Sequence, residues 1–284
     1  LRRHMYPVFF QMPQWVPFLG GQPITSFGVF MLLAFLTAGY VLRAELQRVN
    51  EDPDKAWDFV FMAVIGGILG AKVYYLLLNF PSLIEDPIRM VFSRGGLVWY
   101  GGFLLATALV IREIRRQGLS VPVMADLIAP ALALAYAVGR IGCFLVGDDW
   151  GLPTDSFLGV RFPQGAPATT VQNIEQMFGI TVDPALIEEY GNVVPVHPTQ
   201  LYEVGMSTLI FFILWRIREH GHQKGWLFML WLGCAGVERF LVEFLRAKDD
   251  RFFGVLTVAQ IISLAIVAVG VWGVLKTRAA PEPT

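Results

Sequence analysis

The chain has 284 residues, of which 55% are hydrophobic and only 16% are charged. A soluble domain carries about 25% charged residues, so this composition excludes an ordinary soluble domain and favours a chain embedded in a membrane. The formal net charge of −1 gives no support for a nucleic-acid partner, which would require a basic surface.

Seven apolar runs are candidates for membrane-spanning helices. A helix needs about 20 mostly apolar residues to cross a bilayer. The runs 24–42 and 252–275 contain no charged residue, whereas 95–111 and 199–215 are short, and without these two the count would be five. In chain order the predicted spans are 24–42, 59–78, 95–111, 121–146, 199–215, 225–245 and 252–275.

Basic residues next to the predicted spans indicate how the chain crosses the membrane. With seven spans, eleven Lys and Arg residues fall on the side of the C-terminus, and eight are spread along the other side. Because loops rich in Lys and Arg stay inside, we expect the N-terminus outside and the C-terminus inside. Residues 1–23 then form an outer arm, 147–198 an outer cap and 276–284 an inner tail, with the transmembrane segments at 24–146 and 199–275.

Three cationic side chains lie inside the predicted spans at one depth. Arg140, Arg239 and Lys72 each stand six residues before the outer end of an outward-running span. With a rise of 1.5 Å per residue, this places them about 9 Å below the outer ends of the helices. Because each such charge costs about 2.5–3.5 kcal/mol to insert, an intramembrane cation is by default a candidate functional residue.

Polar residues of several predicted spans fall in the same layer as these cations. Arg239 and Glu243 are four residues apart, and Arg239 and Arg246 seven, so all three share one helix face. The other candidates in this layer are Tyr74, Trp99, Tyr100, His197, Gln200, Tyr202 and Glu203.

Two interpretations of the buried charges remain open. In the first they are structural ion pairs, Arg239 with Glu243 and Arg140 with Glu203 or Glu238. In the second they bind an anion at headgroup depth, since arginine binds the paired oxygens of a phosphate. A phospholipid headgroup is the ligand that this depth and chemistry favour. His197 likewise either holds a loop at a helix start or acts on a ligand.

Small and aromatic residues are interpreted structurally. The glycines of "IGGILGAK" and "WYGGFLLA" would allow close packing of helices. Cys143 and Cys234 match neither a metal site nor a disulfide framework, so we expect small buried residues and no metal. The tryptophans near span ends, predicted to anchor the chain at the membrane interface, are Trp57, Trp99, Trp150 and Trp226.

Several motifs occur in the order found in one bacterial family. They are "ITSFGVFMLLAF", "GAKVYYLLLNFP", "GGLVWYGGF", "DLIAPALALAYAVGRIGC", "HPTQLYE" and "ERFLVEFLR". In addition, "GRIGCFLVGDDWG" at 139–151 falls on a signature whose commoner form is Gly-Arg-x-Gly-Asn-Phe-x-Asn-x-Glu-x-x-Gly. The chain thereby resembles the phosphatidylglycerol–prolipoprotein diacylglyceryl transferase family.

The resemblance implies an all-α enzyme with seven transmembrane helices in the bacterial inner membrane and a site facing the periplasm. Such enzymes transfer the diacylglyceryl group of phosphatidylglycerol to the lipobox cysteine of a prolipoprotein, giving a thioether and glycerol 1-phosphate. By this resemblance, Arg140 and Arg239 are the essential arginines that hold the headgroup. The implied partners are phosphatidylglycerol, the lipobox peptide and membrane lipids, and no metal or other cofactor is implied.

Some positions depart from the family's pattern. Tyr100 stands where many members have a catalytic histidine, and a tyrosine with a pKa of about 10 is a poor base at neutral pH. Lys72 replaces an arginine, Cys143 and Val146 replace asparagines, and Asp148 replaces a glutamate. The predicted catalytic residues are Arg140, Arg239, His197 and Tyr100. The predicted phospholipid-binding residues are Arg140, Arg239, Lys72, Tyr74, Gln200, Glu243, Arg246, Gly142 and Asp148.

Three hypotheses about function remain at this point. The first is the transferase. The second is a phosphatidylglycerol-binding scaffold that keeps the arginines but has lost catalysis, and it is motivated by Tyr100 and the altered signature. The third, an anion transporter, would call for broken helices and internal repeats, and the sequence contains neither.

Overall fold

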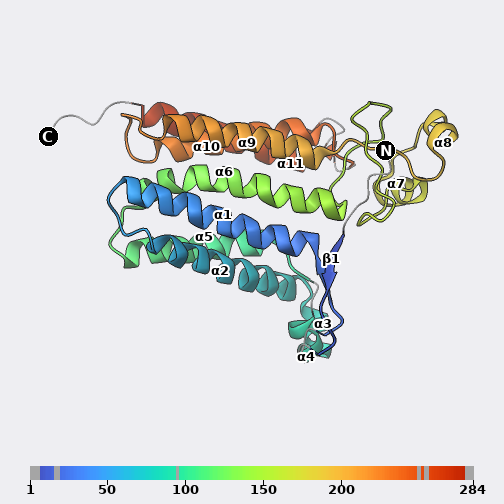
Figure 1. Ribbon diagram of the computed structural model, residues 1–284, viewed down its shortest axis with the longest axis horizontal. Coiled ribbons are helices and arrows are strands. Elements are labelled where there is room, and N and C mark those ends of the chain that lie inside the picture. The colour runs from blue at the N-terminus through green and yellow to red at the C-terminus, as the bar shows by residue number, and fades with distance from the viewer. Residues whose placement is uncertain (1–6, 16–19, 94–95, 248–250, 253–255, 279–284) are drawn as a thin grey trace. The chain divides into compact units, whose positions relative to one another are not determined.

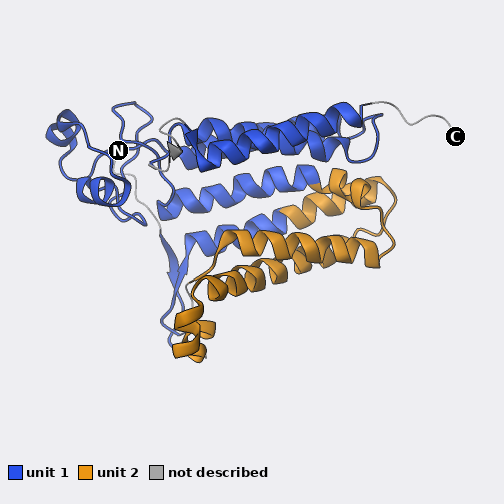
Figure 2. Ribbon diagram, turned by 180° about the vertical axis from the view of Figure 1, so that it is seen from behind, with its two compact units in different colours: residues 1–37, 129–284 blue, residues 38–128 orange. Residues whose placement is uncertain are grey.

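The structure is a computed structural model that describes residues 7–15, 20–93, 96–247, 251–252 and 256–278. The described chain is helical, with strands only in two short antiparallel hairpins. Its contacts divide into two compact units, which Figure 2 colours separately. Unit 1 comprises 1–37 and 129–284, and unit 2 comprises 38–128.

The described helices fall into a long and a short class (Figure 1). The long helices have 18 to 26 residues and are α1 (Ser26–Arg48), α2 (Lys55–Leu78), α5 (Trp99–Arg116), α6 (Val121–Val146), α9 (Thr199–Ile217), α10 (Trp226–Glu243) and α11 (Val258–Lys276). The short helices are α3 (Phe80–Glu85), α4 (Pro87–Phe92), α7 (Val171–Phe178) and α8 (Pro184–Tyr190). Each predicted span overlaps one long helix.

Four of the described helices, α1, α2, α6 and α11, are long and apolar enough to cross a membrane. The protein is therefore an integral membrane protein with an all-α transmembrane part. The prediction of 121–146 agrees with α6 to the residue. The helix α1 continues to Arg48 beyond the predicted end at 42, and its last turn carries a Glu45–Arg48 ion pair of 2.6 Å.

The last helix begins later than predicted. An apolar run from 252 suggested a span, but α11 begins at Val258 because Thr257 caps it. The Thr257 hydroxyl accepts a hydrogen bond from Gln260 N at 3.1 Å, and the Gln260 side chain accepts one from Thr257 N at 3.0 Å. The preceding residues instead form a hairpin of β3 (Arg251–Phe252) and β4 (Leu256–Thr257).

In unit 2, α2 and α5 pack at the distance that glycine allows. A Cβ added to Gly101 would lie 2.3 Å from the carbonyl oxygen of Gly70, and one added to Gly70 would lie 2.3 Å from that of Gly101. The glycines predicted to permit close packing therefore do so. Lys72 of α2 donates hydrogen bonds to the carbonyl and hydroxyl oxygens of Ser93, at 2.8 Å each.

Gly101→Ala is expected to destabilise the protein by about 1–3 kcal/mol, because the added methyl group collides with backbone rather than with a movable side chain. The thermal unfolding midpoint of the detergent-solubilised protein measures this. The matched control is Gly67→Ala on α2, where an added Cβ meets nothing within 4 Å. Equal midpoints for the two variants would contradict the packing argument.

In unit 1, α10 packs against both α9 and α11, and α6 joins them through a small core of Ala133, Leu214 and Leu227. These four helices run beside one another in Figure 1. At the start of the unit, β1 (Val8–Gln11) pairs antiparallel with β2 (Pro23–Thr25) directly before α1.

The segment 147–198 folds around a hydrophobic core to which Ala247, after α10, also belongs. The core residues from the segment are Trp150, Val160, Phe162, Ile174, Val182, Leu186, Val194 and Val196. This corrects one prediction: Trp150 is not an interfacial anchor, since it is only 3% exposed. Its indole Nε1 donates to the carbonyl oxygen of Pro167 at 2.9 Å, and its ring meets Phe178 edge to face. Trp150 is therefore part of the core of this segment.

Candidate functional site

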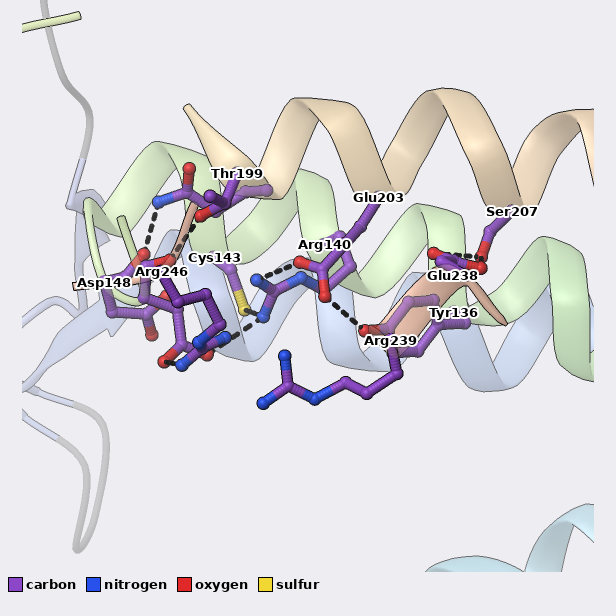
Figure 3. A network of polar contacts seen from close by, with 12 residues as sticks. Tyr136, Arg140, Cys143, Asp148, Thr199, Glu203, Ser207, Glu238, Arg239 and Arg246 are labelled. Atoms are coloured by element: carbon purple, nitrogen blue, oxygen red, sulfur yellow. Dashed lines mark hydrogen bonds and ion pairs between the residues drawn. The ribbon is translucent and has the colours of Figure 1, made fainter. Parts of the chain in front are cut away.

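Arg140 is the centre of the polar network in unit 1 (Figure 3). It stands two turns before the end of α6, and its side chain is only 8% exposed. Its Nη2 forms an ion pair with Glu203 of α9, and its Nη1 lies 3.0 Å from Asp149 Oδ2. The same Nη1 is 3.4 Å from the sulfur of Cys143, one turn further along α6. Two carboxylates from different segments therefore hold one buried guanidinium.

Glu203 receives a second donor from the same face of α6. The Tyr136 hydroxyl donates to Glu203 Oε1 at 2.8 Å, and Tyr136 and Arg140 are one helical turn apart. The Glu203 side chain is 2% exposed. A buried carboxylate of this kind is tolerable only when it is paired and hydrogen-bonded, and Glu203 is both. It therefore fixes Arg140 in place.

A second pair lies at the end of α10. Arg239 Nη2 is 2.6 Å from Glu243 Oε2, and Arg246 Nε is 3.7 Å from the same oxygen. The Thr257 hydroxyl donates to Glu243 Oε1 at 3.1 Å. Glu243 thus lies between two arginines, and the cap of α11 holds it there.

Asp149 joins the two halves of the network. Its Oδ1 forms an ion pair with Arg246 Nη2, while its Oδ2 contacts Arg140. Burial raises the pKa of Asp149, but the charges and hydrogen bonds of Arg246 and Arg140 outweigh it and bring the pKa to about 2. One chain of ion pairs therefore runs from Arg239 through Glu243, Arg246, Asp149 and Arg140 to Glu203.

Four guanidinium nitrogens of this chain are buried and form no hydrogen bond to a described residue. Arg140 Nη2 and Arg246 Nε face carboxylates in ion pairs, whereas Arg140 Nε and Arg239 Nη1 do not. Buried donors are satisfied in most proteins, so the two unused nitrogens are suited to the oxygens of an anionic ligand. Arg239 is the most accessible of the three arginines, with its side chain 31% exposed against 8% for each of the others.

Hydrogen bonds connect the loop after α6 to the start of α9. Gln200 Nε2 donates to the carbonyl oxygen of Asp148, and Thr199 Oγ1 donates to that of Asp149 at 2.6 Å. His197 is half-buried, and its Nδ1 lies 3.1 Å from the Tyr202 hydroxyl. Burial raises the pKa of Asp148, with a further contribution from the charge of Asp149. Burial lowers the pKa of His197, more than the charge of Asp155 raises it.

The ion pairs predicted from the sequence are confirmed. Arg239 pairs with Glu243, and of the two partners considered for Arg140 it is Glu203 that binds it. Glu238 is instead held by the Ser207 hydroxyl, which lies 2.8 and 2.7 Å from its two oxygens. Pairing and ligand binding do not exclude each other here, because the unused nitrogens belong to the paired arginines.

Three members of the network were missed by sequence analysis: Tyr136, Asp149 and Thr257. The sequence could have indicated Tyr136, because it stands four residues before Arg140 and so shares its helix face. Asp149 approaches Arg140 because the chain turns back after α6, where Asp149 itself adopts a φ of 55°. Thr257 reaches Glu243 through tertiary packing, for which the sequence holds no local signal.

Other predicted site residues are not members of this ion-pair chain. Gly142 of α6 packs on α1, where an added Cβ would be 2.7 Å from Phe30 Cβ. Tyr74 and Tyr100 belong to unit 2, as does Lys72, and Tyr100 is exposed beside Trp99. Their approach to Arg140 and Arg239 stays a prediction.

Comparison with known proteins agrees with the motifs. A family model described as prolipoprotein diacylglyceryl transferase matches residues 13–276. The chain belongs to the prolipoprotein diacylglyceryl transferase family. Among its relatives, all named phosphatidylglycerol–prolipoprotein diacylglyceryl transferase, the protein of Clostridium tetani is 30% identical over 94% of this chain and 96% of its own. That of Solidesulfovibrio magneticus is 31% identical over 96% and 98% of the two chains, and that of Bordetella avium 30% over 87% of each.

The match to the diacylglyceryl transferase family includes every residue of the ion-pair chain. Of the predicted site residues, the chain of ion pairs brings together Arg140, Arg239, Glu243 and Arg246, and Gln200 holds the backbone of Asp148 beside it. The geometry of this family member is therefore an arginine cluster with unused donors at the ends of α6 and α10.

Proposed function

We propose that this protein transfers the diacylglyceryl group of phosphatidylglycerol to the lipobox cysteine thiol of prolipoproteins, forming a thioether and releasing glycerol 1-phosphate. Family membership supports the reaction and both substrates. The observation that carries the proposal is the arginine cluster, in which Arg140 Nε and Arg239 Nη1 are buried and have neither a hydrogen-bond nor an ion-pair partner among the described residues. A phosphodiester is the anion whose paired oxygens suit these donors.

The proposal includes the membrane arrangement predicted from the sequence. The seven long helices would be seven spans of the bacterial inner membrane, with the N-terminus and the 147–198 cap in the periplasm and the C-terminus in the cytoplasm. The concentration of basic residues on the side of the C-terminus supports this orientation. The arginine cluster would then lie near the outer surface, at the depth of a phospholipid headgroup.

In the proposed reaction the thiolate sulfur of the lipobox cysteine attacks the glycerol carbon that carries the phosphate. The carbon–oxygen bond breaks, and its electron pair leaves with glycerol 1-phosphate, which gains negative charge. Arg140 and Arg239 would bind the phosphate and stabilise this charge, because preorganised cations act strongly where water is excluded. Arg246 would also contact the phosphate, and Glu243, Gln200 and Asp148 would position the arginines. No metal or other cofactor enters these steps.

The thiol must lose a proton before it attacks, since an unperturbed cysteine has a pKa of about 8.5. His197 is the proposed acceptor, and the cationic cluster would favour the thiolate. Tyr100 would contribute a hydrogen bond rather than act as a base. Lys72 and Tyr74 would add contacts to the headgroup, and Gly142 would allow the close approach of α1 to α6.

Purified protein tests the proposal directly. Incubated with phosphatidylglycerol and a lipobox peptide, it should release glycerol 1-phosphate and convert the peptide to its diacylglyceryl thioether. The same peptide with serine in place of the cysteine should give neither product. Binding of phosphatidylglycerol without release, under conditions in which a related transferase is active, would contradict the proposal and indicate a scaffold that has lost catalysis.

The activity is expected to depend on neutral His197. Because burial lowers its pKa below 6.5, the side chain is neutral at pH 7 and becomes charged only in more acidic solution. The rate should therefore fall only in acidic solution, below about pH 6.5, as His197 becomes protonated. His197→Asn should lower the rate and remove this acid limb from the profile of kcat/KM. An unchanged acid limb in the variant would assign it to another group.

A further inference from the structure

Asp149 occupies a position suited to a phosphate. Its two carboxylate oxygens each face one guanidinium, Oδ2 at 3.0 Å from Arg140 Nη1 and Oδ1 paired with Arg246 Nη2. A carboxylate and a phosphodiester monoanion both present two charged oxygens, and arginine binds either with the same geometry. One carboxylate thus engages nitrogens of two arginines, and one of these, Arg140, also has the unused donor Nε.

Among the carboxylates of the ion-pair chain, Asp149 is the most exposed, and of the described residues only arginines hold it. Its side chain is 43% exposed, against 2% for Glu203 and 0% for Glu243. Tyr136 also holds Glu203, and Thr257 also holds Glu243. Within the described residues, the Asp149 carboxylate has no hydrogen-bond donor besides the two arginines. Rotating this side chain outward would break only those two contacts.

The backbone around Asp149 is fixed, so the side chain can leave alone. Thr199 Oγ1 donates to the Asp149 carbonyl oxygen at 2.6 Å. On the following residues, Gly151 N donates to His197 O at 2.9 Å and Leu152 N to Leu245 O at 2.7 Å. These bonds keep the left-handed backbone of Asp149 in place, with its φ of 55°. None of these hydrogen bonds involves the Asp149 carboxylate.

We propose that Asp149 is a resident anion that occupies the place of the substrate phosphate on Arg140 and Arg246 and is displaced by the phospholipid headgroup. The inference rests on the proposed function, which supplies the identity of the ligand. With no lipid bound, Asp149 supplies a second carboxylate to Arg140, beside Glu203, and to Arg246, beside Glu243. Because headgroup and carboxylate compete for the same nitrogens, Asp149 also lowers the affinity of the protein for phosphatidylglycerol.

Two substitutions remove the carboxylate and keep the backbone. Asp149→Asn and Asp149→Gly both suit a positive φ. Their affinities for short-chain dioctanoyl phosphatidylglycerol in detergent should be about fivefold higher than that of the wild type, and KM for this lipid should fall similarly. The affinity for dioctanoylglycerol, which lacks the phosphate, should not change. Glu175→Gln, which removes one exposed charge from the cap, is the matched control.

The outcomes separate this inference from the transfer reaction, because binding is measured without turnover. Tighter binding of phosphatidylglycerol by both Asp149 variants supports the inference even if no glycerol 1-phosphate is released, a result that would reject only the proposed reaction. Equal or weaker binding by folded Asp149 variants would overturn the inference. Failure of both variants to fold would also overturn it, since Asp149 would then be a structural partner of the arginines.

Discussion

Arg140→Lys is expected to lower the rate of diacylglyceryl transfer at least about 100-fold while the protein still folds. Lysine keeps the charge that Glu203 and Asp149 compensate, but it loses the planar guanidinium that reaches both carboxylates and a phosphate at once. Initial rates of glycerol 1-phosphate release, together with thermal unfolding midpoints, measure the two effects separately.

Two further variants test whether the effect is specific to Arg140 and whether Arg140 serves more than structure. Arg161→Lys changes an arginine of the cap that lies over the ring of Tyr190, outside the network, and should keep wild-type activity. Arg140→Ala should be inactive and also less stable, because it leaves the buried Glu203 without a counter-charge. Substantial activity in Arg140→Ala would show that Arg140 serves structure alone.

Glu203→Gln is expected to destabilise the protein by about 3–5 kcal/mol, because it leaves the buried guanidinium of Arg140 without its principal partner. The amide oxygen of glutamine can still accept the hydrogen bond of Tyr136, so the loss reports mainly the missing charge. Unfolding midpoints in detergent measure the loss. Glu51→Gln, which breaks an ion pair with Lys55 that is partly exposed, should cost at most about 1 kcal/mol.

A double variant distinguishes the ion pair from a general disturbance of the core. Arg140→Met combined with Glu203→Gln removes both charges, so it should be more stable than Glu203→Gln alone while remaining inactive. If the effects of the two substitutions on stability simply added, Arg140 and Glu203 would not be coupled, and the geometry of the network would be wrong.

The part of the fold that depends on local pattern could be predicted from the sequence. Long apolar runs locate the helices, because a bilayer sets their length, and the bounds of α6 agree with the prediction. The helix α1 continues past the end of the predicted span at 42, and α11 begins at Val258, later than the predicted start at 252. The Glu45–Arg48 pair lies in the last turn of α1, and the Thr257–Gln260 capping box starts α11. The hydrophobic pattern of the sequence does not predict such contacts.

The candidate site was predicted to a similar extent. Arg239 and Glu243 share a helix face by spacing, and Arg140 and Glu203 meet because they stand at one depth on two helices. Asp149 could not be placed, because its contacts depend on how the chain turns after α6. The prediction for Trp150 was wrong for the same reason. Its position near the end of a span indicated an anchor at the membrane interface, but the fold of the cap buries it.

Complementation tests the central claim most directly. The chain is expressed in bacteria depleted of their own diacylglyceryl transferase, and the processing of a prolipoprotein is followed. We expect the wild-type chain to restore processing and growth, and Arg140→Ala, present in the membrane at the same level, to restore neither. Equal rescue by the wild type and Arg140→Ala would contradict the proposed function. So would failure of the membrane-inserted wild type when prolipoproteins from the same genome as this chain are expressed with it.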